Sequence, residues 1–407
     1  MILSARWSLL CLACVLPLAP VSAQAQTATL SGASTTTQSA DRNWALTWSS
    51  ETKYLGWRST YRVPDPTGTR DAGSGAQITT STGLQFVGRY EDLWKLQVNL
   101  RGGSMWSQMT SAGVRTTYSG FTDTTLGSTV TYYGFDGFQP FLSLDTNLPT
   151  ATGVANRPKA DPDLSGKQNN GEGSNWGATI GANIPFDRAW VGTIGLGYTY
   201  RGPYTNWNNP GTVRLDPGDV FTLATSLNWK QGPYSLQTSV SYAIETVALQ
   251  DGQDYFRSGD KLTVSETFGY KHSDTWSSKI NASWVHAAKN KIYTNPPPAF
   301  GTESFNSNGD TFSLGVSSSW KFDAWTLTPN AAVFFRNRDD YDTADLKFIP
   351  AKTTMSAGLS GAYAMGAGAI TAGAAHTWAY EGEKIAAATP AIDTRAWTLT
   401  LGGNWKF

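Results

Sequence analysis

The feature that most constrains this chain is strict period-two alternation in its last segment, residues 397–407. Apolar or small side chains occupy every second position: Trp397, Leu399, Leu401, Gly403, Trp405 and Phe407. The intervening positions are polar or small: Thr398, Thr400, Gly402, Asn404 and Lys406. Successive side chains of a β-strand point to opposite faces, so the pattern predicts a strand with one apolar face and one polar face.

The same alternation recurs in residues 94–101, 221–230 and 312–322. A soluble β-sheet protein would also alternate. However, strand after strand here carries outward-facing Trp or Tyr near its end, which is typical of the aromatic girdles of membrane barrels. The sequence therefore predicts an all-β fold, a transmembrane antiparallel β-barrel.

The N-terminus has the features of a secretory signal peptide. Arg6 precedes an apolar stretch over residues 9–18, which is too short to span a bilayer. Small residues then permit cleavage after Ala23 or Ala25. We assign residues 1–25 to the signal peptide.

The rest of the chain divides into a flexible Ser/Thr-rich segment, residues 26–42, and the barrel, residues 43–407. Both cysteines, Cys11 and Cys14, fall within the signal, so the mature chain has neither disulfides nor thiolate metal sites. Charged residues make up 15% of the chain, against about 25% in typical soluble proteins.

No long apolar run follows the signal peptide, so no transmembrane helix is expected in the mature chain. In lipid, every backbone polar group must be paired within the protein, and a closed barrel is the remaining way to span the membrane. This predicts location in the cell outer membrane, with outer-membrane lipid and lipopolysaccharide as surrounding partners. The net charge of zero implies no nucleic-acid partner.

The alternation predicts about 16 strands, with 14 or 12 left open. The predicted strands lie near residues 43–63, 76–89, 94–107, 123–134, 140–148, 174–184, 190–201, 218–230, 234–246, 259–270, 276–287, 308–321, 325–337, 351–363, 368–378 and 393–407. Long loops are expected at 64–75, 108–122, 149–173, 202–217, 247–258, 288–307, 338–350 and 379–392. Short turns join the other strand ends. Short periplasmic turns alternating with long extracellular loops are typical of outer-membrane barrels.

The short turns share an acid flanked by aromatics, as in 90–94, 186–190 and 322–325. The acids suit tight turns, and the aromatics would lie at headgroup depth. Trp405 and the terminal Phe407 resemble the C-terminal signature of proteins inserted by the outer-membrane barrel assembly machinery. This resemblance implies that machinery as a partner during biogenesis.

Two segments resemble a known family of outer-membrane channels. Residues 120–128, Gly-Phe-Thr-Asp-Thr-Thr-Leu-Gly-Ser, and the strand that ends Asn147-Leu-Pro-Thr150 look like motifs of the channel family associated with the meta-pathway of phenol degradation. Ala151 stands where that family has Gly. The resemblance covers about a tenth of the chain, and it implies uptake of small aromatic or apolar solutes.

Residues 161–172 fit the spacing of a Ca²⁺-binding loop. Oxygen-bearing side chains recur at alternating positions around Gly166, which permits a sharp turn. The candidate Ca²⁺ ligands are Asp161, Asp163, Ser165, Asn169 and Glu172. The loop would lack flanking helices, and the same residue types are common in polar loops, so the match also fits an ordinary outer loop.

If the aromatic and aliphatic parity faces lipid, the lumen is rather basic. The predicted pore-lining residues are Lys95, Arg101, Arg201, Lys279, Arg336 and Asp145. A basic wall predicts a mild anion preference, provided that the charges lie in the pore and not merely at its periplasmic end.

Two residues conflict with the strand pattern. Glu266 falls on the lipid-facing parity, which predicts either a bulge that changes the register or cover by a neighbouring protomer. Pro329 falls in mid-strand, where it removes a ladder hydrogen bond. The Gly/Ala-rich pair at 357–375 has a thin outer face, which suggests a homo-oligomer.

Passive uptake of small solutes, aromatic or anionic, is the function that this reading favours, and no enzymatic activity is expected. A rim enzyme of protease or lipase type is an alternative, and it would need His286 or His376 beside a carboxylate and a serine. A plugged structural or adhesive barrel is a third.

Overall fold

A computed structural model describes residues 43–63, 68, 70–111, 113–151, 173–208, 211–294 and 299–407. Within these ranges the regular elements are β-strands, and no helix is long and apolar enough to cross a membrane. The predicted signal peptide (1–25) and flexible segment (26–42) lie outside the described residues.

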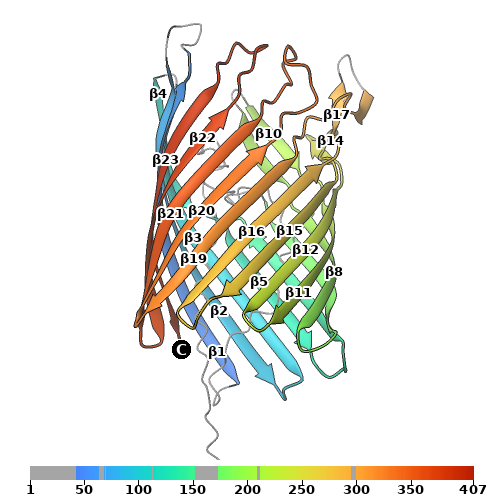
Figure 1. Cartoon of the computed structure of the whole chain (residues 1–407). Helices are drawn as coiled ribbons and strands as arrows, with labels where there is room; N and C mark the ends of the chain where they lie inside the picture. Colours follow the sequence, from blue (N-terminus) through green and yellow to red (C-terminus); the bar gives the residue numbers. More distant parts are fainter. Residues whose placement is uncertain are drawn as a thin grey trace, which may run out of the picture.

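The strands form one closed antiparallel barrel (Figure 1). In chain order its strands are β1 (Trp44–Tyr61), β2 (Asp71–Tyr90), β3 (Trp94–Ser111), β4 (Val114–Phe121), β5 (Thr124–Tyr132), β6 (Gln139–Leu148), β7 (Asn175–Pro185), β8 (Trp190–Arg201), β11 (Val220–Gln231), β12 (Tyr234–Glu245), β15 (Lys261–Lys271), β16 (Trp276–Ala287), β19 (Thr311–Phe322), β20 (Trp325–Arg336), β21 (Lys352–Met365), β22 (Gly368–Glu381) and β23 (Ile392–Lys406). Apart from β4 and β5, which do not pair with each other, each strand pairs with its neighbours in this order, and β1 closes the sheet by pairing with β23.

The sheet contains 17 strands, but β4 and β5 share one position in the wall. The outer half of β3 pairs with β4, and its inner half pairs with β5. Thr122 and Asp123 interrupt what would otherwise be one strand. The wall is therefore a 16-strand barrel, and the prediction of about 16 strands is confirmed.

The wall keeps the predicted alternation. Lipid-facing Ile180, Leu196 and Leu401 are 66%, 60% and 61% exposed. Thr179 and Thr193, on the opposite parity, are buried. An apolar outer band on a closed even-stranded barrel is the form in which a single chain crosses the outer membrane, because closure leaves no unpaired strand edge in lipid.

The short turns lie together at one end of the barrel, with the C-terminus (Figure 1). Glu91, Asp92 and Asp323 have φ of 50°, 52° and 51°, the left-handed conformation that tight hairpins require. Outward aromatics pair across neighbouring strands just above these turns: Trp94 with Tyr132, Trp190 with Trp229, Trp325 with Tyr363, and Trp48 with Trp405. The periplasmic girdle is therefore as predicted.

The outer end is more ordered than predicted. Segments 202–217, 247–258 and 288–307, expected as loops, contain a second sheet of short strands: β9 (Tyr204–Asn208), β10 (Gly211–Asp216), β13 (Ala248–Gln250), β14 (Gln253–Arg257), β17 (Lys291–Thr294) and β18 (Ala299–Thr302). The loop predicted at 108–122 was largely wrong, because β3 extends to Ser111 and β4 fills 114–121. The loop predicted at 64–75 was wrong from Asp71 onwards, where β2 begins. These extensions stand above the membrane, where both faces meet water and no apolar alternation marks the strand.

Pro329 lies where the β19–β20 ladder is interrupted. Ser317 pairs with Asn330 and Trp320 with Leu327, and no pairing joins the residues between. Pro329 has no N–H to donate, so its place at this interruption costs the β19–β20 ladder no hydrogen bond. The Ser319 and Thr328 hydroxyls lie 2.9 Å apart and bridge the gap.

Candidate functional site

The inner wall of the barrel is the candidate site, and its charges fall into three tiers. All six predicted pore-lining residues lie on the inward parity. The first tier lies within two residues of the periplasmic strand ends: Arg89, Lys95, Lys230, Lys321 and Lys406. Of the predicted pore residues, Lys95 therefore lies at the periplasmic mouth.

The outer tier consists of bases held by acids of the same wall. Arg201 donates from a terminal guanidinium nitrogen to Glu245 Oε2 at 2.6 Å, and Lys261 Nζ donates to Glu245 Oε1 at 3.2 Å. Arg336 lies 3.7 Å from Glu381. Glu245 and Glu381 were missed in the sequence because each is the last residue of its strand, where the alternation fades. Their carboxylates neutralise much of the positive charge of Arg201 and Arg336.

The middle tier is mixed in charge. It comprises Glu51 and Lys53 of β1, Arg101 of β3, Asp145 of β6 and Lys279 of β16. Arg101 donates to Ser81 Oγ at 3.3 Å, and Ser81 is the residue opposite Glu51. Glu51 and Lys53 were also missed.

Asp145 lies flat against the wall between two glycines. Gly127 and Gly177 are its cross-strand partners on either side. A Cβ on Gly177 would lie 2.4 Å from Asp145 Oδ1, so the glycine leaves room for the carboxylate. The middle of the lumen therefore presents both signs of charge.

The two segments that carry the family resemblance meet in space. Asn147 Nδ2 donates to Asp123 Oδ2 at 3.1 Å, and the Ala151 N–H donates to Asp123 Oδ1 at 3.0 Å. The Thr124 N–H donates to Thr150 Oγ1 at 2.8 Å. Asp123 and Asn147 are buried. This network fixes the outer ends of β5 and β6, so these motif residues have a structural role at the start of segment 149–173.

An apolar patch on the inner wall was not predicted. Leu55 and Ala396 are 2% and 1% exposed, and Trp57 packs against them. The Trp57 ring lies over Gly75, where a Cβ would come within 2.2 Å of it. Since Leu55 and Ala396 are buried, this part of the inner wall is not an open pore surface.

The histidines lie outside the lumen. His286 Nδ1 is 2.7 Å from Asp310 Oδ1 near the outer end of β16. The His376 ring lies between Trp378 and Trp397, with centroid distances of 4.0 and 4.2 Å. Within the described part of the chain, no recorded contact brings a serine hydroxyl to either ring.

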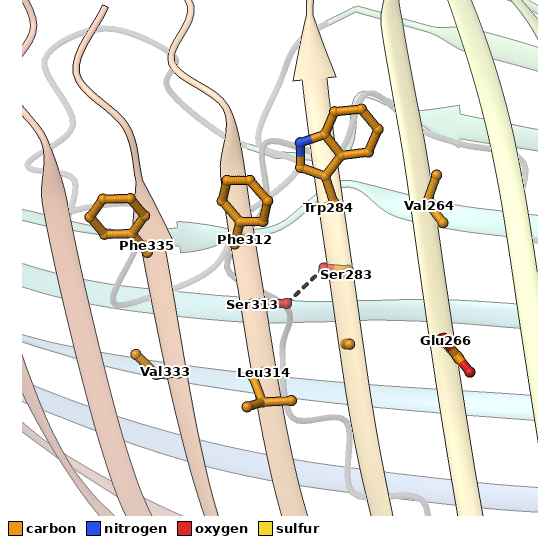
Figure 2. A pocket seen from close by; sticks show the side chains of 10 residues that line it. Val264, Glu266, Ser283, Trp284, Phe312, Ser313, Leu314, Val333 and Phe335 are labelled. Atoms are coloured by element: carbon orange, nitrogen blue, oxygen red, sulfur yellow. Dashed lines mark hydrogen bonds between the residues drawn. The ribbon is translucent and has the colours of Figure 1, made fainter.

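Glu266 lies on the lipid face beside a shallow pocket of about 380 Å³ (Figure 2). Thr238 and Ala282 flank it in an unbroken register, so the predicted bulge is wrong. Small Ala282 lines the pocket together with larger side chains: Val264, Trp284, Phe312, Leu314, Val333 and Phe335. Cover by a neighbouring protomer stays a prediction.

The predicted Ca²⁺ ligands Asp161, Asp163, Ser165, Asn169 and Glu172 lie outside the described residues. Among the residues that are described, no three His, Cys, Asp or Glu side chains are grouped as metal ligands would be.

No protein-family model matches the chain, and no curated protein matches it. Several solved structures that resemble it are outer-membrane channels. A FadL homologue of Pseudomonas aeruginosa is 11% identical, with 90% of each chain covered and a TM-score of 0.43. An outer membrane channel from Pseudomonas putida F1 is 10% identical, with 91% of this chain and 99% of that chain covered and a TM-score of 0.39.

The deltaS2S3 mutant of the TodX monoaromatic hydrocarbon channel is 10% identical, with 90% of this chain and 91% of that chain covered and a TM-score of 0.45. These identities and TM-scores carry no argument about function. The strand pairing of the chain itself shows the barrel, and the charges of its inner wall determine which solutes it favours.

Proposed function

We propose that the protein is a passive outer-membrane channel for small water-soluble solutes, with a mild preference for anions. The observation that carries the proposal is that inward-facing bases extend from the first tier at the periplasmic mouth into the middle of the lumen, where Lys53, Arg101 and Lys279 lie. Glu51, Asp145, Glu245 and Glu381, which are acids of the described inner wall, all lie farther out than the first tier. A ring of one charge sign within a low-dielectric wall raises the local concentration of the opposite ion.

The preference should be mild because acids lie close to the basic tier. The periplasmic turns below it carry Glu91, Asp92, Asp187 and Asp323. Above it, Asp145 and Glu51 face the same lumen as Arg101 and Lys279. A permeating ion therefore passes one predominantly basic ring between two mixed layers.

The test is the reversal potential of the purified channel in a planar bilayer under a KCl gradient. We expect weak anion selectivity. The variant K95A/K230A/K321A should move the reversal potential towards cation selectivity. The control variant R336A/E381A removes an ion pair from the outer tier and should move it less, because the net charge of the wall is unchanged. Cation selectivity of the unaltered protein would contradict the proposal.

A rim hydrolase is the competing function, and the His286–Asp310 pair is the observation that favours it. A hydrolytic site also needs a nucleophile that is hydrogen-bonded to the other ring nitrogen of the histidine. We expect His286→Ala to leave the conductance unchanged. We also expect no lipid or peptide hydrolysis by the unaltered protein that this variant abolishes. A hydrolytic activity that disappears in this variant would establish the enzyme instead.

We also propose that the loop at 161–172 binds Ca²⁺ and that the C-terminal Phe407 acts as an assembly signal. Calcium titration should increase the protease resistance of residues 149–173, and unchanged resistance would contradict a Ca²⁺ site there.

Removal of Phe407 should slow membrane insertion. Its backbone N–H donates to Leu46 O at 2.8 Å, so Phe407→Ala, which keeps this bond, separates the role of the side chain from closure of the barrel.

A further inference from the structure

Two arginines face each other on the outer surface of the barrel. Arg58 of β1 and Arg395 of β23 are direct cross-strand partners, and both are exposed. They share the outward parity of Tyr54 and Trp397. Side chains directly opposite on paired strands have Cβ atoms about 4.5–5.5 Å apart, and like charges at such positions repel.

The pair lies at the outer edge of the apolar band. Arg395 precedes Trp405, in the periplasmic girdle, by ten residues. At about 3.4 Å per residue and a strand tilt near 40°, this corresponds to roughly 26 Å along the membrane normal. The apolar band of such barrels is about 25 Å tall. Trp378, opposite Arg395, and Trp397 place the pair beside the outer aromatic girdle.

The nearby acids are already engaged. Asp393 is held by Arg62, with Arg62 Nε donating to Oδ2 at 3.0 Å and Arg62 Nη2 donating to Oδ1 at 3.3 Å. Asp71 accepts a hydrogen bond from the Gly73 N–H at 3.3 Å. Within the described residues, no recorded contact joins a carboxylate to Arg58 or Arg395.

The basic character continues along the same side of the rim. Arg58 lies opposite Ser74, Ser74 opposite Thr110, and Thr110 opposite Arg115 of β4. We refer to Arg58, Arg115 and Arg395 as the basic arc. The outer ends of β4 and β23 lie on one side of the barrel, away from β14 and β17 (Figure 1).

We propose that Arg58 and Arg395 bind a phosphate group of lipopolysaccharide in the outer leaflet. Arginine presents a fork of N–H donors that matches phosphate, and two guanidiniums on one phosphate exchange mutual repulsion for charge-assisted hydrogen bonds. The depth of the pair, at the boundary between the apolar band and water, is the depth of a lipid headgroup. The proposal does not depend on what crosses the lumen.

The test measures lipid binding by the purified full-length barrel with native mass spectrometry. The ligands are phosphorylated lipopolysaccharide, the same lipid after enzymatic removal of its phosphates, phosphatidylglycerol and inorganic phosphate. We expect R58Q/R395Q to weaken binding of phosphorylated lipopolysaccharide by at least tenfold, and R58E/R395E to weaken it further. R58K/R395K should retain part of the affinity, since lysine keeps the charge but not the fork.

The matched control is K230Q/K321Q, which removes two positive charges from the inner wall at the periplasmic end. It should bind lipopolysaccharide as the unaltered protein does. Heat-modifiable migration in gels shows that each variant is folded. If the double variant does not fold, the comparison of phosphorylated with dephosphorylated lipid on the unaltered protein still decides the matter.

Equal binding of the two lipopolysaccharide forms would overturn the proposal, as would unchanged binding by R58Q/R395Q. If phosphatidylglycerol or inorganic phosphate binds as tightly and is lost in the same variant, the site takes any phosphate and the assignment to lipopolysaccharide is wrong. Loss of lipopolysaccharide binding together with unchanged ion selectivity would separate this site from the lumen.

Discussion

The two sides of the outer rim differ in whether their charged side chains have partners within the chain. On one side the acids find donors within the chain: Tyr198 Oη donates to Asp219 at 2.6 Å, Tyr242 Oη to Asp260 at 2.8 Å, and Trp284 Nε1 to Asp310 at 3.1 Å. We refer to Asp219, Asp260 and Asp310 as the acidic arc. On the other side, Arg58 and Arg395 face each other, and among the described residues no carboxylate contacts either of them.

The contrast separates charges that stabilise the barrel from charges that are available to a partner. Each acid of the acidic arc ties an outward aromatic of the girdle to the end of an outer segment, one residue before the next wall strand begins. Its hydrogen bonds are satisfied without lipid. Arg58 and Arg395 have no such hydrogen bond to a carboxylate among the described residues, and we propose that their mutual repulsion is relieved by an anion from outside.

Breaking the acidic arc should have the largest effect on stability. Asp260→Asn weakens an acceptor that serves both Tyr242 and Arg257, whose guanidinium lies 2.9 Å from Asp260. We expect a loss of about 1–2 kcal/mol in the free energy of unfolding, measured by urea titration in lipid vesicles. Binding of lipopolysaccharide should not change. A variant as stable as the unaltered protein would show that the acidic arc is not a structural feature.

Replacing Glu266, a lipid-facing acid with no hydrogen-bond partner among the described residues, should make the barrel more stable. Glu266 lies below the acidic arc, on β15, with Thr238 and Ala282 opposite. Glu266→Leu should stabilise the barrel in vesicles by about 1 kcal/mol, because a carboxyl group in lipid costs free energy that Leu does not. Thr238→Leu on the adjacent outward position is the matched control. Destabilisation by Glu266→Leu would instead favour a protomer contact at this face.

A smaller effect should come from Asp339, in the segment that joins β20 to β21. Burial raises the pKa of Asp339, although its carboxylate accepts hydrogen bonds from the Tyr341 and Ile349 N–H groups. A raised pKa means that the folded loop favours the protonated form. Its contribution to stability is therefore present at low pH and is lost as the pH rises through the folded pKa.

Hydrogen exchange of the Tyr341 and Ile349 amides, corrected for intrinsic rates, measures this effect. We expect protection to decrease by less than tenfold between pH 4 and pH 7. Asp339→Asn should remove the pH dependence. Protection that increases over this range would show that ionised Asp339 is the stabilising form.

The wall of the barrel could be predicted from the sequence because lipid and lumen impose opposite chemistry on alternate residues. Residues 397–407, 221–230 and 312–322 each show the parity that the structure has. The small second sheet could not be predicted in this way. Strands such as β9 and β13 stand above the membrane, where neither face is forced to be apolar.

The candidate site divides along the same line. Alternation alone placed Arg101, Lys279 and Asp145 on the inner wall. It could not show that Glu245 neutralises Arg201 and Lys261, because these residues are on three different strands and meet only through the barrel register.

The sequence by itself determined that this chain is a membrane barrel, which parity faces lipid and which end faces the periplasm, since these follow from local patterns along single strands. The tertiary structure alone decided which charges meet. Closure of β1 on β23 brings Arg58 opposite Arg395 across more than 300 residues of chain, and the meeting of β5 with β6 joins Asp123 to Asn147. Pairing of distant strands depends on the register and on the closure of the barrel, and the sequence of a single strand determines neither.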